Sequence, residues 1–498
     1  MQVTEAEYAD CDATELAERV RRKDVHPSEL VALAVQAIER VNPQLNAVVH
    51  EMYGQARDAA AGELPDGPFR GVPMVVKDFD GFVKGVPFTA STRFLDGWVP
   101  DHDSEAIARL RRAGFVFVAK TNCPELAIFG TTEPVWRGPT RNPWDPDRST
   151  GGSSGGSAAL VGARAVPLGH GGDGGGSLRI PASHCGLVGL KTTRGRIPLG
   201  PDQGEGWGGY VSWGVLTRSV RDTAAALDVM AGPMPGDPYA APPLERPLAD
   251  EVGRDPGKLR IGYTTASLYG KEAHPDNVAA VEAAAGMLRD LGHAVEVAAP
   301  RFDRHRLVMA YLTQVAVGVA QEVEEMGRWR GVTPTAASFE PPTWFLVQLG
   351  RSMRALELLE AREAVQAAGR ATAAFHQDYD LFLSASCATP PVRIGELALK
   401  TSERLGLSVL RRAPVGAVLR RVLADLADNN LERTPNTQLF NQTGQPAISL
   451  PLHTGEGGLP IGVQLAAAMG GEGLLVRIAA QLEAAHPWIG RKPGISAG

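Results

Sequence analysis

The chain has 498 residues, 44% of them hydrophobic, which is typical of a globular protein with a large buried core. Its 50 lysines and arginines stand against 56 aspartates and glutamates, a net charge of −6 with no long run of one sign. This balance excludes the electrostatic footprint of a nucleic-acid-binding protein. The four cysteines are widely spaced and form no Cys-x-x-Cys pair, which argues against a zinc ribbon or a disulfide framework and favours a cytoplasmic location.

The sequence also gives no sign of a membrane protein. No apolar run is long enough to span a bilayer, and residues 1–7 lack the basic and apolar regions of a signal peptide. We therefore expect neither a membrane nor a nucleic acid as a partner.

The predicted elements begin with helices and continue as strands that alternate with helices. Apolar residues recur at helical spacing around Leu16 and again over residues 30–41, after Pro27 at a position typical of a helix start. Short apolar runs predict strands at residues 71–76, 115–119, 186–190, 259–263, 294–297, 381–384, 447–450 and 461–465. Helical patterns predict helices at residues 104–113, 278–291 and 474–485. Strands separated by helices indicate an α/β fold with a large, mostly buried sheet.

The chain is expected to form one domain over residues 1–498. Residues 232–257 are rich in proline, glycine and aspartate, which is typical of a surface connection. Residues 302–430 are mostly helical in pattern, and two Pro-Pro pairs, at 341–342 and 390–391, interrupt them.

Two serine-bearing glycine clusters carry the chemistry of the chain. The first spans residues 151–157 and reads Gly-Gly-Ser-Ser-Gly-Gly-Ser, and the second spans 174–181 and reads Gly-Gly-Gly-Ser-Leu-Arg-Ile-Pro. Glycines let successive N–H groups point at one place, which makes a binding site for an anion. A serine in such a loop has a candidate oxyanion hole beside it, but its hydroxyl needs a base to become a nucleophile.

Three segments, in this order, resemble the amidase signature hydrolases. They are Gly-Val-Pro-Met-Val-Val-Lys-Asp at 71–78, the first glycine cluster, and Gly-Asp-Gly-Gly-Gly-Ser-Leu-Arg-Ile-Pro-Ala at 172–182. Flanking segments also match the family, at residues 120–125, 141–144, 185–191 and 441–447. The resemblance covers most of the chain and implies the family's fold, a large mixed β-sheet with helices on both sides. In relatives the part that corresponds to 302–430 varies and helps to shape the substrate entrance.

The resemblance also implies the roles of individual residues. Ser177 would be the nucleophile, Ser153 the bridging serine after a cis peptide bond, and Lys77 the base at the end of the relay. The oxyanion would lie among the backbone N–H groups of the second glycine cluster, namely those of Gly174, Gly175, Gly176 and Ser177. The resemblance implies no metal and no cofactor, and the many homodimers among free-standing relatives imply a homodimer here.

Two acidic residues beside these motifs bear on the chemistry. A lysine acts as a base only in its neutral form, and burial favours that form. Lys77 follows an apolar run, so we expect it to be buried, with the Asp78 side chain on the opposite face of the strand. Asp173 is expected to brace the second glycine cluster by accepting hydrogen bonds from its N–H groups.

Three segments of the sequence indicate the kind of substrate, and one residue departs from the family pattern. The segments at 131–134 and 436–441 look like the branch that acts on nylon oligomers and related synthetic amides, some members of which cleave carbamates. Ile128 and Phe129 match a position that lines the substrate channel in relatives, which predicts an apolar wall and a neutral, hydrophobic or aryl acyl portion. Gly172 stands where many relatives have serine or threonine.

Two motifs formally match other classes of protein. Residues 152–156 match Gly-x-Ser-x-Gly of the α/β-hydrolase esterases with Ser154 as nucleophile, but a turn-like segment stands where that motif needs a strand. Residues 169–174 match the Gly-x-Gly-x-x-Gly dinucleotide fingerprint, but no acidic residue follows between 174 and 201.

The sequence therefore predicts a serine hydrolase that cleaves the C–N bond of small hydrophobic or aryl amides. Three alternatives use the same residues. They are a urethanase that hydrolyses carbamates, a hydrolase of 6-aminohexanoate (nylon) oligomers, and a glutamine amidotransferase A-type subunit.

Overall fold

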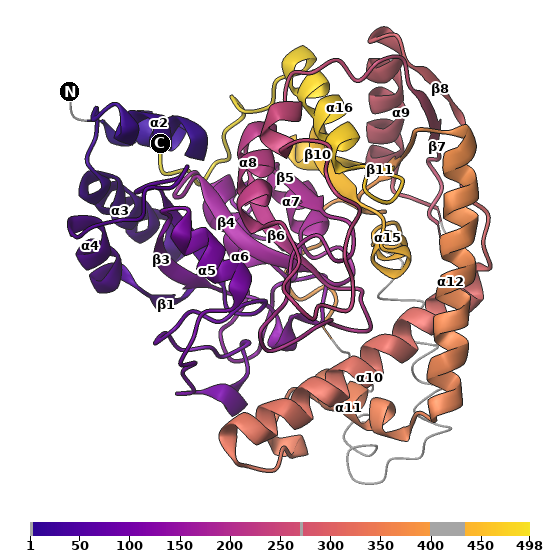
Figure 1. Ribbon diagram of the computed structural model, residues 1–498, viewed down its shortest axis with the longest axis horizontal. Coiled ribbons are helices and arrows are strands. Elements are labelled where there is room, and N and C mark those ends of the chain that lie inside the picture. Colours follow the sequence, from indigo (N-terminus) through magenta and orange to yellow (C-terminus); the bar gives the residue numbers. More distant parts are fainter. Residues whose placement is uncertain (1–2, 269–271, 399–433) are drawn as a thin grey trace.

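The computed structural model describes residues 3–268, 272–398 and 434–498 (Figure 1). Within these ranges the core is one large sheet. Its strands are β1 (Val48–Glu51), β2 (Pro73–Lys77), β3 (Val116–Thr121), β4 (Leu168–Asp173), β5 (Val188–Lys191), β6 (Ser212–Thr217), β7 (Arg260–Tyr263), β8 (Ala294–Val297), β9 (Leu381–Ala385), β10 (Ala447–Thr454) and β11 (Pro460–Ala467). The 11 described strands lie in the order β1-β3-β2-β4-β6-β5-β10-β11-β9-β7-β8.

The sheet is mixed, as predicted. Strand β2 runs parallel to β3 and β4, and β7 runs parallel to β8 and β9. The remaining neighbours pair antiparallel. Every residue of β2 to β6 is buried, which explains why these strands lack a polar face.

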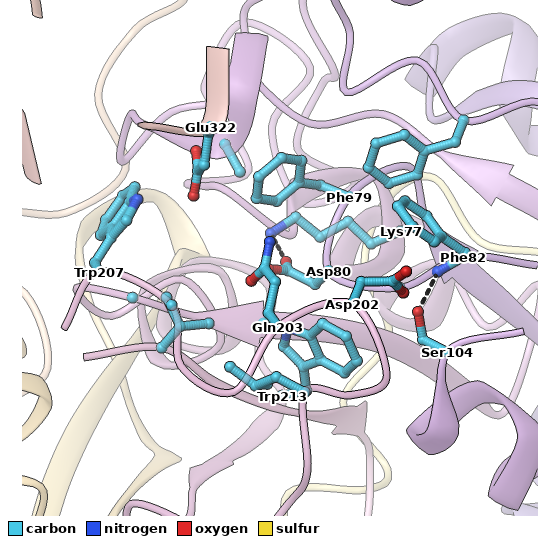
Figure 2. A pocket seen from close by; sticks show the side chains of 18 of the residues that line it. Lys77, Phe79, Asp80, Phe82, Ser104, Asp202, Gln203, Trp207, Trp213 and Glu322 are labelled. Atoms are coloured by element: carbon cyan, nitrogen blue, oxygen red, sulfur yellow. Dashed lines mark hydrogen bonds and ion pairs between the residues drawn. The ribbon is translucent and has the colours of Figure 1, made fainter. Parts of the chain in front are cut away.

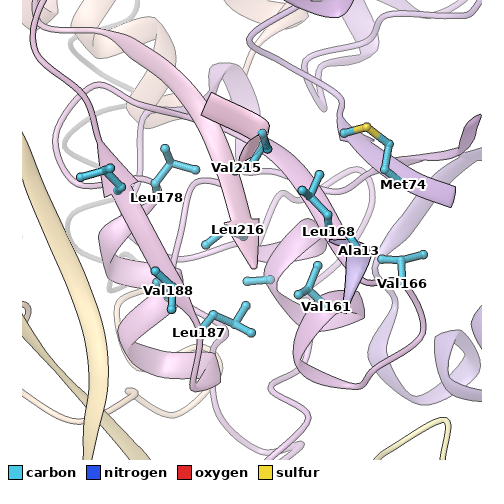
Figure 3. Packing of buried hydrophobic residues seen from close by; sticks show 14 of the residues in the cluster. Ala13, Met74, Val161, Val166, Leu168, Leu178, Leu187, Val188, Val215 and Leu216 are labelled. Carbon is cyan, nitrogen blue, oxygen red and sulfur yellow. The ribbon is translucent and has the colours of Figure 1, made fainter. Parts of the chain in front are cut away.

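Helices pack against both faces of this sheet. Helices α6 and α7 contact each other and the strands β4, β5, β10 and β11, whereas α8 and α16 contact each other and the strands β5, β6, β10 and β11. Figure 3 shows the apolar core on both faces of the sheet, with Leu168 of β4 and Val215 of β6 on one face and Leu216 of β6 and Val161 of α6 on the other. The helices are α1 (Glu5–Asp10), α2 (Ala13–Arg21), α3 (Pro27–Leu45), α4 (Tyr53–Ala61), α5 (Glu105–Arg112), α6 (Gly155–Gly162), α7 (Arg179–Cys185), α8 (Val220–Met230), α9 (Pro275–Asp290), α10 (Arg304–Arg330), α11 (Pro341–Ser352), α12 (Ala355–Asp378), α15 (Gln438–Thr443) and α16 (Glu472–Ala485).

All eight predicted strands are present, with ends that differ by a few residues from the apolar runs that indicated them. Three further strands, β1, β4 and β6, were not predicted. Strand β4 reads Leu-Gly-His-Gly-Gly-Asp, and its glycines are more typical of a loop than of a strand interior. Those glycines make room for other side chains. A Cβ at Gly169 would lie 2.9 Å from Cβ of Ser157, for example.

Three helices take up most of the described part of the region predicted to be mostly helical, which also contains β9. Helix α10 contacts both α11 and α12, and the three extend away from the sheet (Figure 1). Residues 399–430 of that region lie outside the described residues. None of the helices in the described ranges is both long and apolar enough to cross a membrane.

Candidate active site

The three residues of the predicted relay come from distant parts of the chain and line one pocket. Lys77 is the last residue of β2, Ser153 lies in the loop before α6, and Ser177 lies between β4 and α7. The space between the walls of this pocket, including the part open to solvent, amounts to about 770 Å³ (Figure 2).

Lys77 reaches Ser153 directly. Its Nζ donates a hydrogen bond of 2.8 Å to Oγ of Ser153, and the side chain is only 1% exposed. The peptide bond between Gly152 and Ser153 is cis. Asp78 points away from this contact, as predicted. Its carboxylate accepts a hydrogen bond from the Thr89 N–H and lies 3.7 Å from Nζ of Lys120.

The sequence did not reveal the acidic partner of Lys77. That partner is Asp80, which forms a buried ion pair with Nζ of Lys77 and has φ of +62°. A Cβ at Gly172 would overlap the carboxylate of Asp80, so a side chain at position 172 and this placement of Asp80 exclude each other. The departure at Gly172 was therefore the one signal in the sequence that pointed to Asp80.

The loop that carries Ser177 is braced by Asp173, as predicted. The carboxylate accepts hydrogen bonds from the N–H groups of Gly176 at 2.7 Å and Leu178 at 3.2 Å. It also accepts two from the Arg179 guanidinium, at 2.8 and 2.9 Å, and one from the Asn441 amide at 2.8 Å. Burial acts to raise the pKa of Asp173, but the charge and hydrogen bonds of Arg179, with the Asn441 amide, lower it to about 2.

The hydrogen bonds to Asp173 engage only one of the four N–H groups that were predicted to hold an oxyanion. The N–H of Gly176 is engaged by Asp173, so its direct contact with an oxyanion stays a prediction. The N–H groups of Gly174, Gly175 and Ser177 donate no hydrogen bond to any other described residue. Ser177 and Gly174 line the pocket and Gly175 does not, so the contact of these N–H groups with an oxyanion stays a prediction.

The walls of the pocket are largely aromatic. Phe79, Trp207 and Trp213 line it, together with Met326 and Trp329 from the α10 helix. Its lining includes Ala127 but neither of the two residues that follow it. Ile128 and Phe129 are half-buried beside the pocket, and their contact with a substrate stays a prediction.

The segments that formally match an esterase motif and a dinucleotide-binding motif do not have the local structure that either function needs. Oγ of Ser154 donates a hydrogen bond of 3.2 Å to the carbonyl of Gly172, and this serine is not among the lining residues of the pocket. Two of the three glycines of the dinucleotide fingerprint, Gly169 and Gly171, lie inside β4 rather than in a turn after a strand. In the described part of the chain, no group of three or more His, Cys, Asp or Glu side chains could hold a metal ion.

Two histidines near the motifs are neutral core residues. Burial, with the charges of Lys120 and Lys77, lowers the pKa of His170 to about 3. Burial lowers the pKa of His184 to about 4. Neither histidine lines the pocket.

Comparisons with known proteins identify the family. The family model for amidases matches residues 29–476, and the chain belongs to this family, the amidase signature enzymes, which hydrolyse carbon–nitrogen bonds of amides. The chain is 40% identical to a 6-aminohexanoate-cyclic-dimer hydrolase of Pseudomonas sp. (strain NK87), over 97% of this chain and 96% of that protein.

Solved structures agree with this assignment. A 6-aminohexanoate cyclic dimer hydrolase in complex with its substrate matches with a TM-score of 0.89 at 38% identity, over 98% of this chain and 99% of that one. A bacterial aryl acylamidase of the amidase signature family matches with a TM-score of 0.83 at 25% identity, over 97% of this chain and 99% of that one.

The crowding at Gly175 leads to a first prediction. A Cβ at this position would overlap the hydroxyl of Tyr311, whose ring carbon Cζ would lie 3.1 Å away. Gly175→Ala should therefore displace the loop and lower kcat/KM by about 100-fold, the loss typical of one missing oxyanion donor. Adding Tyr311→Phe should restore most of this loss, and Tyr311→Phe alone serves as the control. Full activity of Gly175→Ala would contradict this placement of the loop.

The buried charge of Arg179 leads to a second prediction. Asp173→Asn leaves the guanidinium without its carboxylate, which should lower the free energy of unfolding by about 3–5 kcal/mol at pH 7, measured in urea. The pKa of Asp173 lies near 2, below its ordinary 3.8, so the carboxylate stabilises the fold above about pH 4. The difference between wild type and variant should shrink as the pH falls through 2.

A control is available on the protein surface. Glu324→Gln removes an exposed ion pair with Arg351 and should change the same quantity by less than about 1 kcal/mol. A loss at Asp173→Asn no larger than that of the control would show that the brace is not needed for stability.

Proposed function

We propose that the chain hydrolyses hydrophobic or aryl carboxylic amides through a relay of Ser177, Ser153 and Lys77 and an acyl-enzyme on Ser177. The observation that carries this proposal is the hydrogen bond of 2.8 Å from Nζ of Lys77 to Oγ of Ser153, in the pocket that Ser177 also lines. A buried lysine beside a serine hydroxyl is the arrangement that activates a nucleophile without histidine.

The proposed reaction has two halves. Oγ of Ser177 attacks the carbonyl carbon, and its proton passes through Oγ of Ser153 to Nζ of Lys77. The negative oxygen is stabilised by the N–H groups of Gly174, Gly175 and Ser177. The C–N bond then breaks as the proton returns to the leaving nitrogen, and water releases the acid from Ser177 by the same relay.

Asp80 supplies the counter-charge for Lys77 in the proposed reaction. When Lys77 accepts the proton it becomes an ammonium group in a buried site, which is costly without a counter-charge. The ion pair with Asp80 offsets this cost and holds Nζ toward Ser153.

The pocket supports a substrate with an apolar or aromatic part, because aromatic side chains make up much of its wall. The relatives support amides, since their names specify a 6-aminohexanoate cyclic dimer and aryl acylamides. A carbamate presents a similar carbonyl carbon to the same loop, and carbamate hydrolysis is therefore the second candidate function.

The ion pair of Lys77 and Asp80 yields a prediction. Asp80→Asn should lower kcat by about 10-fold or more, because the Lys77 ammonium that forms during the reaction loses its counter-charge. Asp202→Asn removes a carboxylate that lines the same pocket and is the matched control, which should leave kcat unchanged. An unchanged kcat in Asp80→Asn would show that the counter-charge is not needed.

The choice between amide and carbamate is tested with a matched pair of substrates. We expect a 4-nitroanilide to be hydrolysed, and Ser177→Ala to lower kcat/KM by at least about 10⁴-fold. The corresponding N-(4-nitrophenyl) carbamate is measured beside it. Comparable turnover of both would support the urethanase function, and turnover of neither would contradict the proposed substrate class.

A further inference from the structure

The charges that line the active-site pocket are unbalanced. Among its described lining residues, Lys77 is the single cationic side chain, and it is already paired with Asp80. Three more carboxylates, those of Asp202, Glu322 and Glu325, line the same pocket. The relay accounts for Lys77 and Asp80 but gives the other three no function.

Glu322 is the carboxylate that most needs a partner. It projects from α10, and Figure 2 shows its carboxylate pointing into the pocket between the rings of Trp207 and Phe79. Its Oε2 atom is buried and makes no hydrogen bond of normal distance and angle with any described residue, although the Trp207 indole lies close enough to act on the pKa of this carboxyl. A buried carboxylate oxygen without a partner is costly, and such a group in a pocket indicates that a ligand supplies the missing contact.

The surroundings of Glu322 favour a cation over a neutral group as that ligand. The rings of Phe79, Trp207 and Trp329 line the pocket, and aromatic faces attract cations through their quadrupoles. Aromatic rings combined with a carboxylate form the kind of site that binds an alkylammonium group. An anionic group at the same place would meet Glu322, Glu325 and Asp80 together.

We propose that Glu322 and the neighbouring aromatic rings bind an ammonium group of the substrate, so that the preferred amides carry a protonated amine at the end of an apolar chain. This inference rests on the proposed function and narrows its substrate class. The apolar part of the chain contacts the aromatic wall, and its charged end reaches Glu322.

The protonation of Glu322 is consistent with this role. Burial, with the nearby charge of Asp80, raises the pKa of Glu322 to about 8. Glu325 also faces this side of the pocket, and burial raises its pKa too. The raised pKa favours the protonated form of Glu322 when no cation is near, and an incoming ammonium group takes the place of that proton.

The test compares two probes that differ only in charge. They are 6-aminohexanoyl-4-nitroanilide and heptanoyl-4-nitroanilide, in which an ammonium group and a methyl group end chains of the same length. Binding is measured by calorimetry with the full-length Ser177→Ala form, so that no turnover is needed. At pH 8.5 the alkylammonium group, with a pKa of about 10.4, stays charged.

We expect the ammonium probe to bind at least 10-fold more tightly than the methyl probe. Adding Glu322→Gln should weaken the ammonium probe at least 10-fold and change the methyl probe by less than about 3-fold. Adding Glu324→Gln, an exposed carboxylate on the same helix paired with Arg351, is the matched control and should change neither.

Two results would overturn the inference. One is that the Ser177→Ala form, in which Glu322 is intact, binds the methyl probe as tightly as the ammonium probe or more tightly. The other is equal weakening of both probes by Glu322→Gln, which would mean that Glu322 donates a hydrogen bond to an uncharged part of the substrate. If wild type hydrolyses neither probe but the charge preference is present, the proposed function fails and the ammonium site stands.

Discussion

The buried contact between Lys77 and Ser153 is the constraint on which the rest of the site depends. A lysine at the end of a central strand has to be held without water, close to a serine hydroxyl, and beside a counter-charge. Each requirement is met by a different part of the chain. The apolar run of β2 buries the lysine, the first glycine cluster brings Ser153 to it, and the loop after β2 returns Asp80 to the same nitrogen.

The glycines around this contact supply space more than flexibility. Gly172 leaves room for the Asp80 carboxylate, and Gly175 leaves room for the Tyr311 hydroxyl. The hydrogen bonds of the Asp173 carboxylate with the Gly176 N–H and the Arg179 guanidinium, all buried, then hold the loop that carries Ser177 in place. Rigid placement of donors before the reaction is what makes such loops effective in stabilising an oxyanion.

Much of the fold and of the relay could be predicted from the sequence, because both depend on local patterns. Apolar runs such as 115–119 correspond to buried strands, and the spacing of Ser153 and Ser177 resembles that of a known family. Strand β4 could not be predicted, because its glycines owe their strand structure to neighbours that are distant in sequence. Asp80 and Glu322 were missed for the same reason, since single acidic residues acquire a role only when folding brings Lys77 or an aromatic wall beside them.

Mass spectrometry of the trapped protein shows whether Ser177 forms a covalent acyl-enzyme. Wild-type protein is mixed with an activated acyl ester, quenched with acid within milliseconds, and digested for peptide mapping. We expect one added acyl group on the peptide that contains Ser177, and none in the Ser177→Ala variant. An acyl group on Ser154, or turnover without any adduct at Ser177 under conditions that trap the intermediate, would contradict it.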